Sequence, residues 1–160
     1  MNDLTRPVYA EINLDNIKYN LQQLKKQLCN DTMIMAIVKA DAYGHGAIEV
    51  ARVLVNEGVE RLGVALPEEG AELRESGIKI PIQVLGEILP SQEKLLFRYN
   101  LIPTIARNDT LKKINELAVR KKIIKKIHIK IDTGMARIGK PPDTGIKLIK
   151  KAYKLPGIKV

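Results

Sequence analysis

Short apolar runs alternate with amphipathic stretches along most of the chain. The apolar runs have the length of buried strands, and we expect strands at 33–38, 62–65, 80–85, 101–105, 123–132 and 157–160. Between these runs, apolar residues recur every three or four positions, as they do on one face of an α-helix. Strands and helices therefore follow one another at intervals of roughly 20 to 30 residues, which is typical of repeated βα units around a parallel sheet.

Individual residues predict where some of these elements begin. Short polar side chains accept hydrogen bonds from the first free amides of a helix, so we expect N-caps at Asp15, at Ser91 and at Asn108 or Asp109. Residues 7–14 alternate enough to predict an extended entry strand before the first helix. The last helix is predicted to carry its apolar residues at Ile146, Ile149 and Tyr153.

Two α/β architectures fit this alternation: a (β/α)8 barrel of the TIM type and a doubly wound open sheet. The first strand is not followed by the G-x-G-x-x-G loop that binds dinucleotides, which weakens the nucleotide-binding version of the open sheet. Six strands cannot close an eight-stranded barrel, so a barrel would be incomplete here. No linker-like segment interrupts residues 1–160, which predicts one incomplete domain.

The composition is that of a globular domain, since 45% of the 160 residues are hydrophobic. The formal net charge is +9, and nucleic-acid binding is one interpretation of such an excess of lysine and arginine. We favour solvated helix faces instead, because the lysines alternate with core positions and the sequence contains no nucleic-acid-binding motif.

The sequence also lacks the usual signs of membrane insertion or secretion. No apolar stretch has the length of a bilayer span, and the first residues do not resemble a signal peptide. The single cysteine, Cys29, cannot form an internal disulfide, which is compatible with a reducing cytoplasm. We therefore expect a cytoplasmic protein that binds neither membranes nor nucleic acid.

Lys39 directly follows the apolar run 33–38 and precedes a turn that contains Gly44 and Gly46. It is therefore expected at the carboxyl end of a buried strand, where ligands and catalytic groups gather in barrels and open α/β sheets. Apolar surroundings destabilise the ammonium form of a lysine, so its neutral amine becomes available to attack an aldehyde. The alternative is a lysine that extends from the strand end into water without any chemical role.

A second polar constellation lies in and after the predicted strand 123–132. Alternation places His128, Lys130 and Asp132 on one face of this strand, toward the interior of a barrel. Charges on an inner face are costly unless they are paired, so Lys130 and Asp132 should have partners. Arg137 lies in the following loop, where its planar guanidinium could hold a carboxylate. A salt-bridge network without a ligand is the alternative, and a metal site is disfavoured by the competing charge of Lys130.

Two strings in these segments resemble the signatures of a known family. V-K-A-D-A-Y-G-H-G at 38–46 and K-I-D-T-G-M-A-R-I-G at 130–139 resemble alanine racemases, the fold-type III enzymes that use pyridoxal 5'-phosphate. The resemblance implies the (β/α)8 barrel. It further implies that Lys39 binds the cofactor as a Schiff base and that Tyr43 reaches the cofactor phosphate. Arg137 matches an arginine near the cofactor's phenolic oxygen and the substrate carboxylate, and Lys130 matches a lysine that is carbamylated in some members and then bonds to that arginine.

The same resemblance implies a racemase that interconverts L-alanine and D-alanine, with D-alanine serving cell-wall (peptidoglycan) synthesis. Lys39 would move the α-proton on one face of the substrate. The opposite base would be a tyrosine from a carboxyl-terminal β domain, supplied across a homodimer interface. We expect that domain to be absent from these 160 residues, and the chain alone not to racemise alanine. The alternatives are a racemase of serine or lysine, and a single-barrel pyridoxal-phosphate-binding protein without turnover, which the residues after Lys39 disfavour.

Overall fold

The structure is a computed structural model that describes residues 8–29 and 31–160. In this part of the chain, one five-stranded parallel sheet has the order β1-β2-β3-β4-β6, and β5 and β7 form a separate parallel pair. The strands are β1 (Met35–Ile37), β2 (Arg61–Val64), β3 (Ile82–Val84), β4 (Ile102–Ile105), β5 (Lys125–Lys126), β6 (His128–Ile129) and β7 (Ile158–Lys159). The helices are α1 (Leu14–Lys26), α2 (Lys39–Gly44), α3 (Ala47–Asn56), α4 (Pro67–Glu75), α5 (Glu93–Arg98), α6 (Asn108–Arg120) and α7 (Pro142–Ala152).

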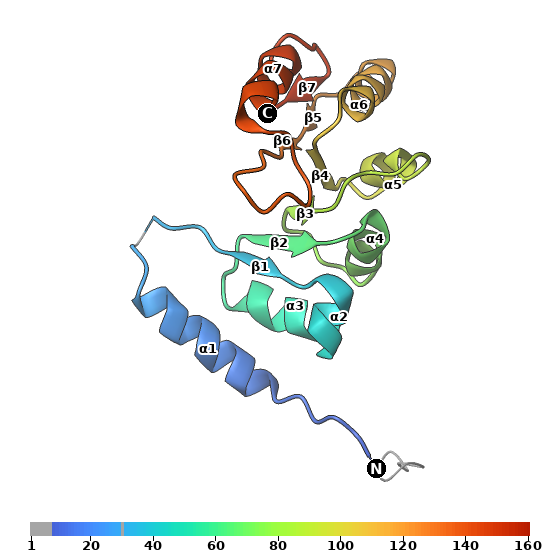
Figure 1. Ribbon diagram of the computed structural model, residues 1–160. Coiled ribbons are helices and arrows are strands. Elements are labelled where there is room, and N and C mark those ends of the chain that lie inside the picture. Colours follow the sequence, from blue (N-terminus) through green and yellow to red (C-terminus); the bar gives the residue numbers. More distant parts are fainter. Residues whose placement is uncertain (1–7, 30) are drawn as a thin grey trace.

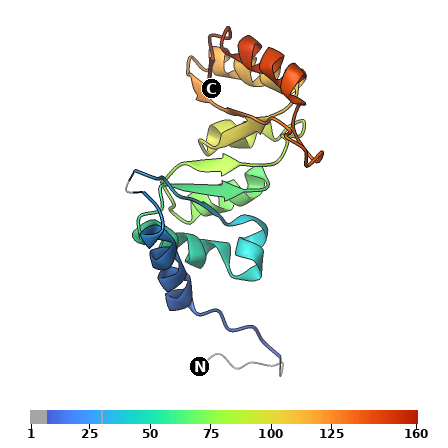
Figure 2. The ribbon, with the colours of Figure 1, turned by 60° about the vertical axis from the view of Figure 1, so that its left-hand side comes forward.

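The helices between consecutive strands lie along one side of the sheet, and Figure 1 shows α3, α4, α5 and α6 there in the order of the strands. Consecutive parallel strands require such crossover connections, because the chain must return to the same end of the sheet each time. The sheet extends between α3 and α7 (Figure 2), and its edge strands β1 and β6 are not hydrogen-bonded to each other. None of the described helices is both long and apolar enough to cross a membrane.

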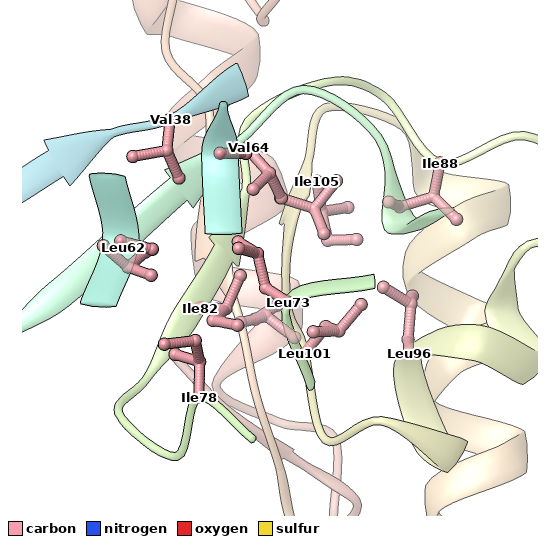
Figure 3. Packing of buried hydrophobic residues seen from close by; sticks show 14 of the residues in the cluster. Val38, Leu62, Val64, Leu73, Ile78, Ile82, Ile88, Leu96, Leu101 and Ile105 are labelled. Atoms are coloured by element: carbon pink, nitrogen blue, oxygen red, sulfur yellow. The ribbon is translucent and has the colours of Figure 1, made fainter. Parts of the chain in front are cut away.

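The hydrophobic core lies between the sheet and these helices. Leu62, Ile82 and Ile105 on the strands are completely buried. On the helices, Leu73 of α4 and Leu96 of α5 are at most 1% exposed. Figure 3 shows their side chains packed against one another. Burial of each such side chain contributes about 1.5–3 kcal/mol, so this layer fixes the positions of the strand ends that carry the site.

The predicted strand 123–132 is divided in the structure, so the expectation of a single continuous strand was wrong. β5 pairs with β7, whereas β6 pairs with β4 in the larger sheet. The two halves therefore have different neighbours, with the buried Ile127 between them. Farther on, Ile131 forms an isolated bridge with Lys140. The segment thus leaves one strand pair and joins the other sheet before it reaches Lys130.

The predicted entry strand is also wrong for the residues that the structure describes. Residues 8–13 have no regular secondary structure, and Val8 and Tyr9 are largely exposed because no neighbouring strand pairs with them; Pro7 lies outside the described residues. The helix α1 begins two residues earlier than expected, at Leu14. Its N-cap is Asn13, whose Oδ1 accepts hydrogen bonds from the amides of Asp15 at 2.9 Å and Asn16 at 3.2 Å.

The N-caps predicted for α5 and α6 also differ from the observed ones. Ser91 has a left-handed backbone, with φ 77°, and the N-cap of α5 is Gln92. Asn108 and Asp109 both lie in the first turn of α6, whose N-cap is Arg107. In α7 the buried residues are Gly145, Leu148 and Ala152, whereas Ile146 and Tyr153 are exposed.

Candidate active site

Lys39, Lys130 and Arg137 line one cleft with a volume of about 280 Å³. The cleft is built at the carboxyl ends of three strands: Lys39 follows β1, Leu85 follows β3, and the remaining lining residues follow β6. The other lining residues are Ile131, Asp132, Thr133, Met135 and Ile138. The structure therefore brings together three of the four site residues predicted from the sequence.

The shared cleft requires a curved sheet, because β1 and β6 are its opposite edges. In a flat sheet with about 4.8 Å between neighbouring strands, four steps would separate these strands by about 19 Å. Curvature shortens that distance, and the loop after β6 extends toward β3 (Figure 1). Residues from both edges can then line the same hollow, as they do at the mouth of a barrel.

Lys39 occupies the junction between β1 and an unusual turn. The preceding residue, Val38, is 1% exposed, and its amide donates to the carbonyl of Gly63 in β2 at 2.9 Å, which fixes the end of the strand. Lys39 itself is half-buried, and its Nζ lies 5.8 Å from the centre of the Tyr43 ring. Tyr43 is exposed and is not among the residues that line the cleft, although it contacts the lysine that does.

The turn after Lys39 is left-handed. Ala40, Asp41, Ala42 and Tyr43 all have φ between 50° and 57°. The left-handed helical conformation costs roughly 1–2 kcal/mol per residue for L-amino acids, so four in succession persist only when the surroundings hold them. Backbone strain of this kind clusters at functional sites, and here it directly follows the candidate reactive lysine.

Hydrogen bonds from both sides hold this turn in place. Asp41 Oδ1 accepts from the amide of Ala47 at 2.6 Å and thereby satisfies the first free amide of α3. The His45 ring Nδ1 lies 2.9 Å from the carbonyl of Ala42, and because a carbonyl can only accept, Nδ1 carries the proton in this contact. Glu69 Oε1 accepts from the amide of Ala40 at 2.7 Å.

Sequence reasoning did not identify these supporting residues. Glu69 is the third residue of α4 and accepts from the amide of the N-cap Leu66 at 3.1 Å, so an acidic residue at this helix position was the available signal. Its contact with Ala40 joins positions 29 residues apart. No local pattern predicts that contact.

The loop after β6 is organised by Asp132. Its Oδ1 accepts hydrogen bonds from the amides of Gly134 and Ala136, both at 3.0 Å. These bonds hold the pKa of the Asp132 carboxyl below its ordinary value, with a smaller contribution from the charge of Lys130. The predicted partner of Asp132 therefore exists, but it is the backbone of its own loop.

Lys130 does not have the charged partner that was expected. Within residues 8–29 and 31–160, it forms no ion pair within 4.0 Å. Lys130 and Arg137 are exposed, so neither charge pays the desolvation penalty that would require pairing. With Lys39, the cleft carries three basic side chains against the single carboxylate of Asp132, a balance that favours an anionic ligand.

Comparison with known proteins decides the family. The sequence profile described as "Alanine racemase, N-terminal domain" matches residues 12–160. The chain belongs to the alanine racemase N-terminal domain family. It is 53% identical over 157 residues to alanine racemase of Halothermothrix orenii. The aligned region covers 98% of this chain and 41% of that protein.

Solved structures of alanine racemases have the same fold. The Clostridium difficile 630 alanine racemase in complex with cycloserine is 41% identical and superposes with a TM-score of 0.93 over 99% of this chain and 44% of that one. The Bartonella henselae alanine racemase with covalently bound pyridoxal phosphate is 27% identical, with a TM-score of 0.83 over 93% and 43% of the two chains.

These matches confirm the predicted family and the predicted incomplete (β/α)8 barrel. They also decide between the two architectures left open by the strand pattern, in favour of the barrel. The chain spans about two fifths of the length of the relatives it matches.

Proposed function

We propose that this chain forms the cofactor-binding part of a pyridoxal-phosphate-dependent racemase that interconverts L-alanine and D-alanine. One observation carries the proposal: the lysine and the arginine of the two family signatures line a single cleft. Membership of the alanine racemase family supports the reaction, and a relative with covalently bound pyridoxal phosphate supports the cofactor. We further propose a cytoplasmic homodimer that supplies D-alanine for peptidoglycan.

The chemistry of the cleft fits this cofactor. Pyridoxal phosphate is an anionic aldehyde, and the cleft combines a primary amine at Lys39 with the cationic side chains of Lys130 and Arg137. The carboxylate of Asp132 accepts hydrogen bonds from two backbone amides of its own loop. These bonds reduce the repulsion between this carboxylate and a bound anion. The exposed phenol of Tyr43, next to Lys39, is the proposed contact for the phosphate.

Lys39 has two proposed tasks. Its Nζ would hold the cofactor through the aldehyde group, and the same amine would move the α-proton on one face of a bound amino acid. When bound, the cofactor supplies an electron sink for the charge left at the α-carbon. After Lys39 the chain turns through the strained left-handed residues 40–43 and does not continue into an ordinary right-handed helix.

Arg137 has a binding task. Its planar guanidinium can form two parallel hydrogen bonds to a carboxylate, which fixes the orientation of the amino acid in the cleft. Lys130, if carbamylated, would become an anion and a partner for Arg137. The base on the opposite face is proposed to be a tyrosine of a carboxyl-terminal β domain from the partner subunit.

The test is a chimera in which this chain replaces the matching region of the Halothermothrix orenii alanine racemase. We expect the chimera to form D-alanine from L-alanine, with serine and lysine as poorer substrates, and expect its Lys39→Ala variant to lose turnover. The parent enzyme is the control for assay conditions. A folded chimera that fails to racemise alanine, or turnover that survives Lys39→Ala, would contradict the proposal. The 160-residue chain alone is expected to form no D-alanine in the same assay.

A further inference from the structure

Glu69 connects two separate βα units by its side chain. Its Oε1 accepts from the amide of Ala40 at 2.7 Å, while its Oε2 accepts from the amides of Ala65 at 2.6 Å and Leu66 at 3.1 Å. The carboxylate is half-buried in the first turn of α4. Both oxygens are therefore used, one toward the turn after Lys39 and one toward the end of β2.

The Ala40 contact differs from the other bonds that hold the left-handed turn. Ala42 donates to the carbonyl of Val38, Asp41 accepts from Ala47, and His45 contacts Ala42, so these bonds lie within residues 38–47. In the part of the chain that the structure describes, Glu69 is the side chain from another unit that hydrogen-bonds to this turn. Among the described residues, its carboxylate hydrogen-bonds both to this turn and to the amides that follow β2.

We propose that Glu69 is a positioning residue for Lys39. By fixing the Ala40 amide relative to the end of β2, its carboxylate sets the direction in which the Lys39 side chain enters the cleft. A charged acceptor suits this role, because hydrogen bonds to a carboxylate are stronger than those to a neutral group. The proposal rests on the function proposed above for Lys39, but the contact itself is testable without the cofactor.

Glu68 provides a matched control. It is the neighbouring residue in the same helical turn, it is exposed, and its carboxylate accepts from Gln92 Nε2 at 3.0 and 3.1 Å. Glu68→Gln therefore removes the same charge from the same turn without affecting Ala40. Glu69→Gln leaves only one acceptor oxygen, so it cannot accept from Ala40 and from the pair Ala65 and Leu66 at the same time. We expect the oxygen to stay with the two amides of Ala65 and Leu66, which leaves the amide group, a donor, facing Ala40.

Glu69→Asp separates helix capping from positioning. The aspartate retains a carboxylate that can accept from the amides at the start of α4, but its side chain is one methylene shorter and does not span to Ala40. If Glu69→Gln prevents folding, Glu69→Asp still tests the proposal. Circular dichroism and urea unfolding establish that each variant is folded before any other measurement.

The first readout is amide hydrogen exchange of the 160-residue chain, measured by NMR without cofactor. We expect the Ala40 amide to exchange at least about tenfold faster in Glu69→Gln and Glu69→Asp, as the loss of a charge-assisted hydrogen bond predicts. Exchange at Val84 in the core, and all exchange in Glu68→Gln, should remain as in the unchanged chain. An unaltered Ala40 rate in both Glu69 variants would overturn the contact.

The second readout is the selectivity of lysine modification. Formaldehyde with a mild borohydride methylates neutral amines, and mass spectrometry gives the rate at each lysine relative to the exposed Lys122. We expect the methylation rate of Lys39, relative to that of Lys122, to change at least about threefold in both Glu69 variants. The way this relative rate depends on pH should change as well, and both should stay unchanged in Glu68→Gln. Faster Ala40 exchange with an unchanged Lys39 profile would show a merely structural role and overturn the proposal. Failure of pyridoxal phosphate to react with Lys39 in the unchanged chain would instead contradict the proposed function.

Discussion

Lys39 and Arg137 line one cleft although they follow the two edge strands of the five-stranded sheet. That relationship is possible because the sheet curves and the loop after β6 extends toward β3. It turns two separate sequence signatures into one site with an amine and a guanidinium. Curvature of the barrel wall, rather than proximity in sequence, is therefore the structural cause of the proposed chemistry.

The role proposed for Arg137 predicts the effect of a conservative substitution. Arg137→Lys keeps the positive charge but loses the planar fork that can bind a carboxylate with two hydrogen bonds. In the active chimera we expect kcat/KM for alanine to fall at least about tenfold while the cofactor remains bound. Arg120→Lys, at the exposed end of α6, is the matched control. Equal turnover in the two variants would mean that Arg137 has no part in binding substrate.

Gly86 predicts a stability effect close to the site. A Cβ at this position would lie 2.6 Å from the backbone carbonyl oxygen of Ala65, which cannot rotate away as a side chain can. We expect Gly86→Ala to lower the free energy of unfolding by about 1–3 kcal/mol, measured by urea denaturation with an unchanged m value.

Gly63→Ala is the comparison, because its added Cβ would meet the flexible end of Ile37, at 2.6 Å from Cδ1. A side-chain end can move, so Gly63→Ala should destabilise less than Gly86→Ala. The opposite order would show that the junction of Ala65 and Gly86 is more adaptable than its geometry indicates.

Lys125 predicts how stability depends on pH. It is 4% exposed, and its Nζ donates to the carbonyl of Leu96 at 2.7 Å near the end of α5. Burial, together with the charge of Arg74, lowers the pKa of Lys125 from 10.5 to about 8. Between these values the unfolded chain binds a proton that the folded chain has released, so the contribution of Lys125 to the free energy of unfolding rises with pH.

The rise should amount to about 3 kcal/mol across this window, and below pH 8 the full penalty of the buried charge is present. Urea unfolding of Lys125→Met isolates this contribution. As pH rises from 8 to 10.5, the free energy of unfolding of the unchanged chain should increase relative to that of the variant. The exposed neighbour provides the control variant Lys126→Met, whose difference should be nearly constant. A constant difference for Lys125→Met would contradict the account.

The strand pattern was predictable because burial imposes it. The run that ends at Val38 is less buried than expected, because β1 is an edge strand and Met33 and Ile37 are exposed. The runs in β2, β3 and β4 are apolar because they are buried between their neighbours and the helices, and the carboxyl ends of parallel strands meet at one end of the sheet. From these two facts the meeting of Lys39, Lys130 and Arg137 in one cleft could be expected. The division between β5 and β6 could not, because it depends on which strands lie on either side.

The left-handed turn and its supports were also beyond local reasoning. Alanine and tyrosine have no preference for positive φ, so Ala40 and Tyr43 adopt it only because tertiary hydrogen bonds outweigh the strain. Asn13 rather than Asp15 caps α1, although both residues are good caps, since cap geometry depends on where the chain turns. Contacts such as that between Glu69 and Ala40 arise only once the βα units have packed together.

The central claim is that Lys39 is the residue that binds pyridoxal phosphate. The most direct measurement is reduction of the chain with borohydride in the presence of pyridoxal phosphate, followed by peptide mass spectrometry to locate the stable label. We predict one preferred label on Lys39, and none at a comparable level on any other lysine in the Lys39→Ala variant. A preferred label on Lys130, or labelling spread evenly over the exposed lysines, would contradict the account.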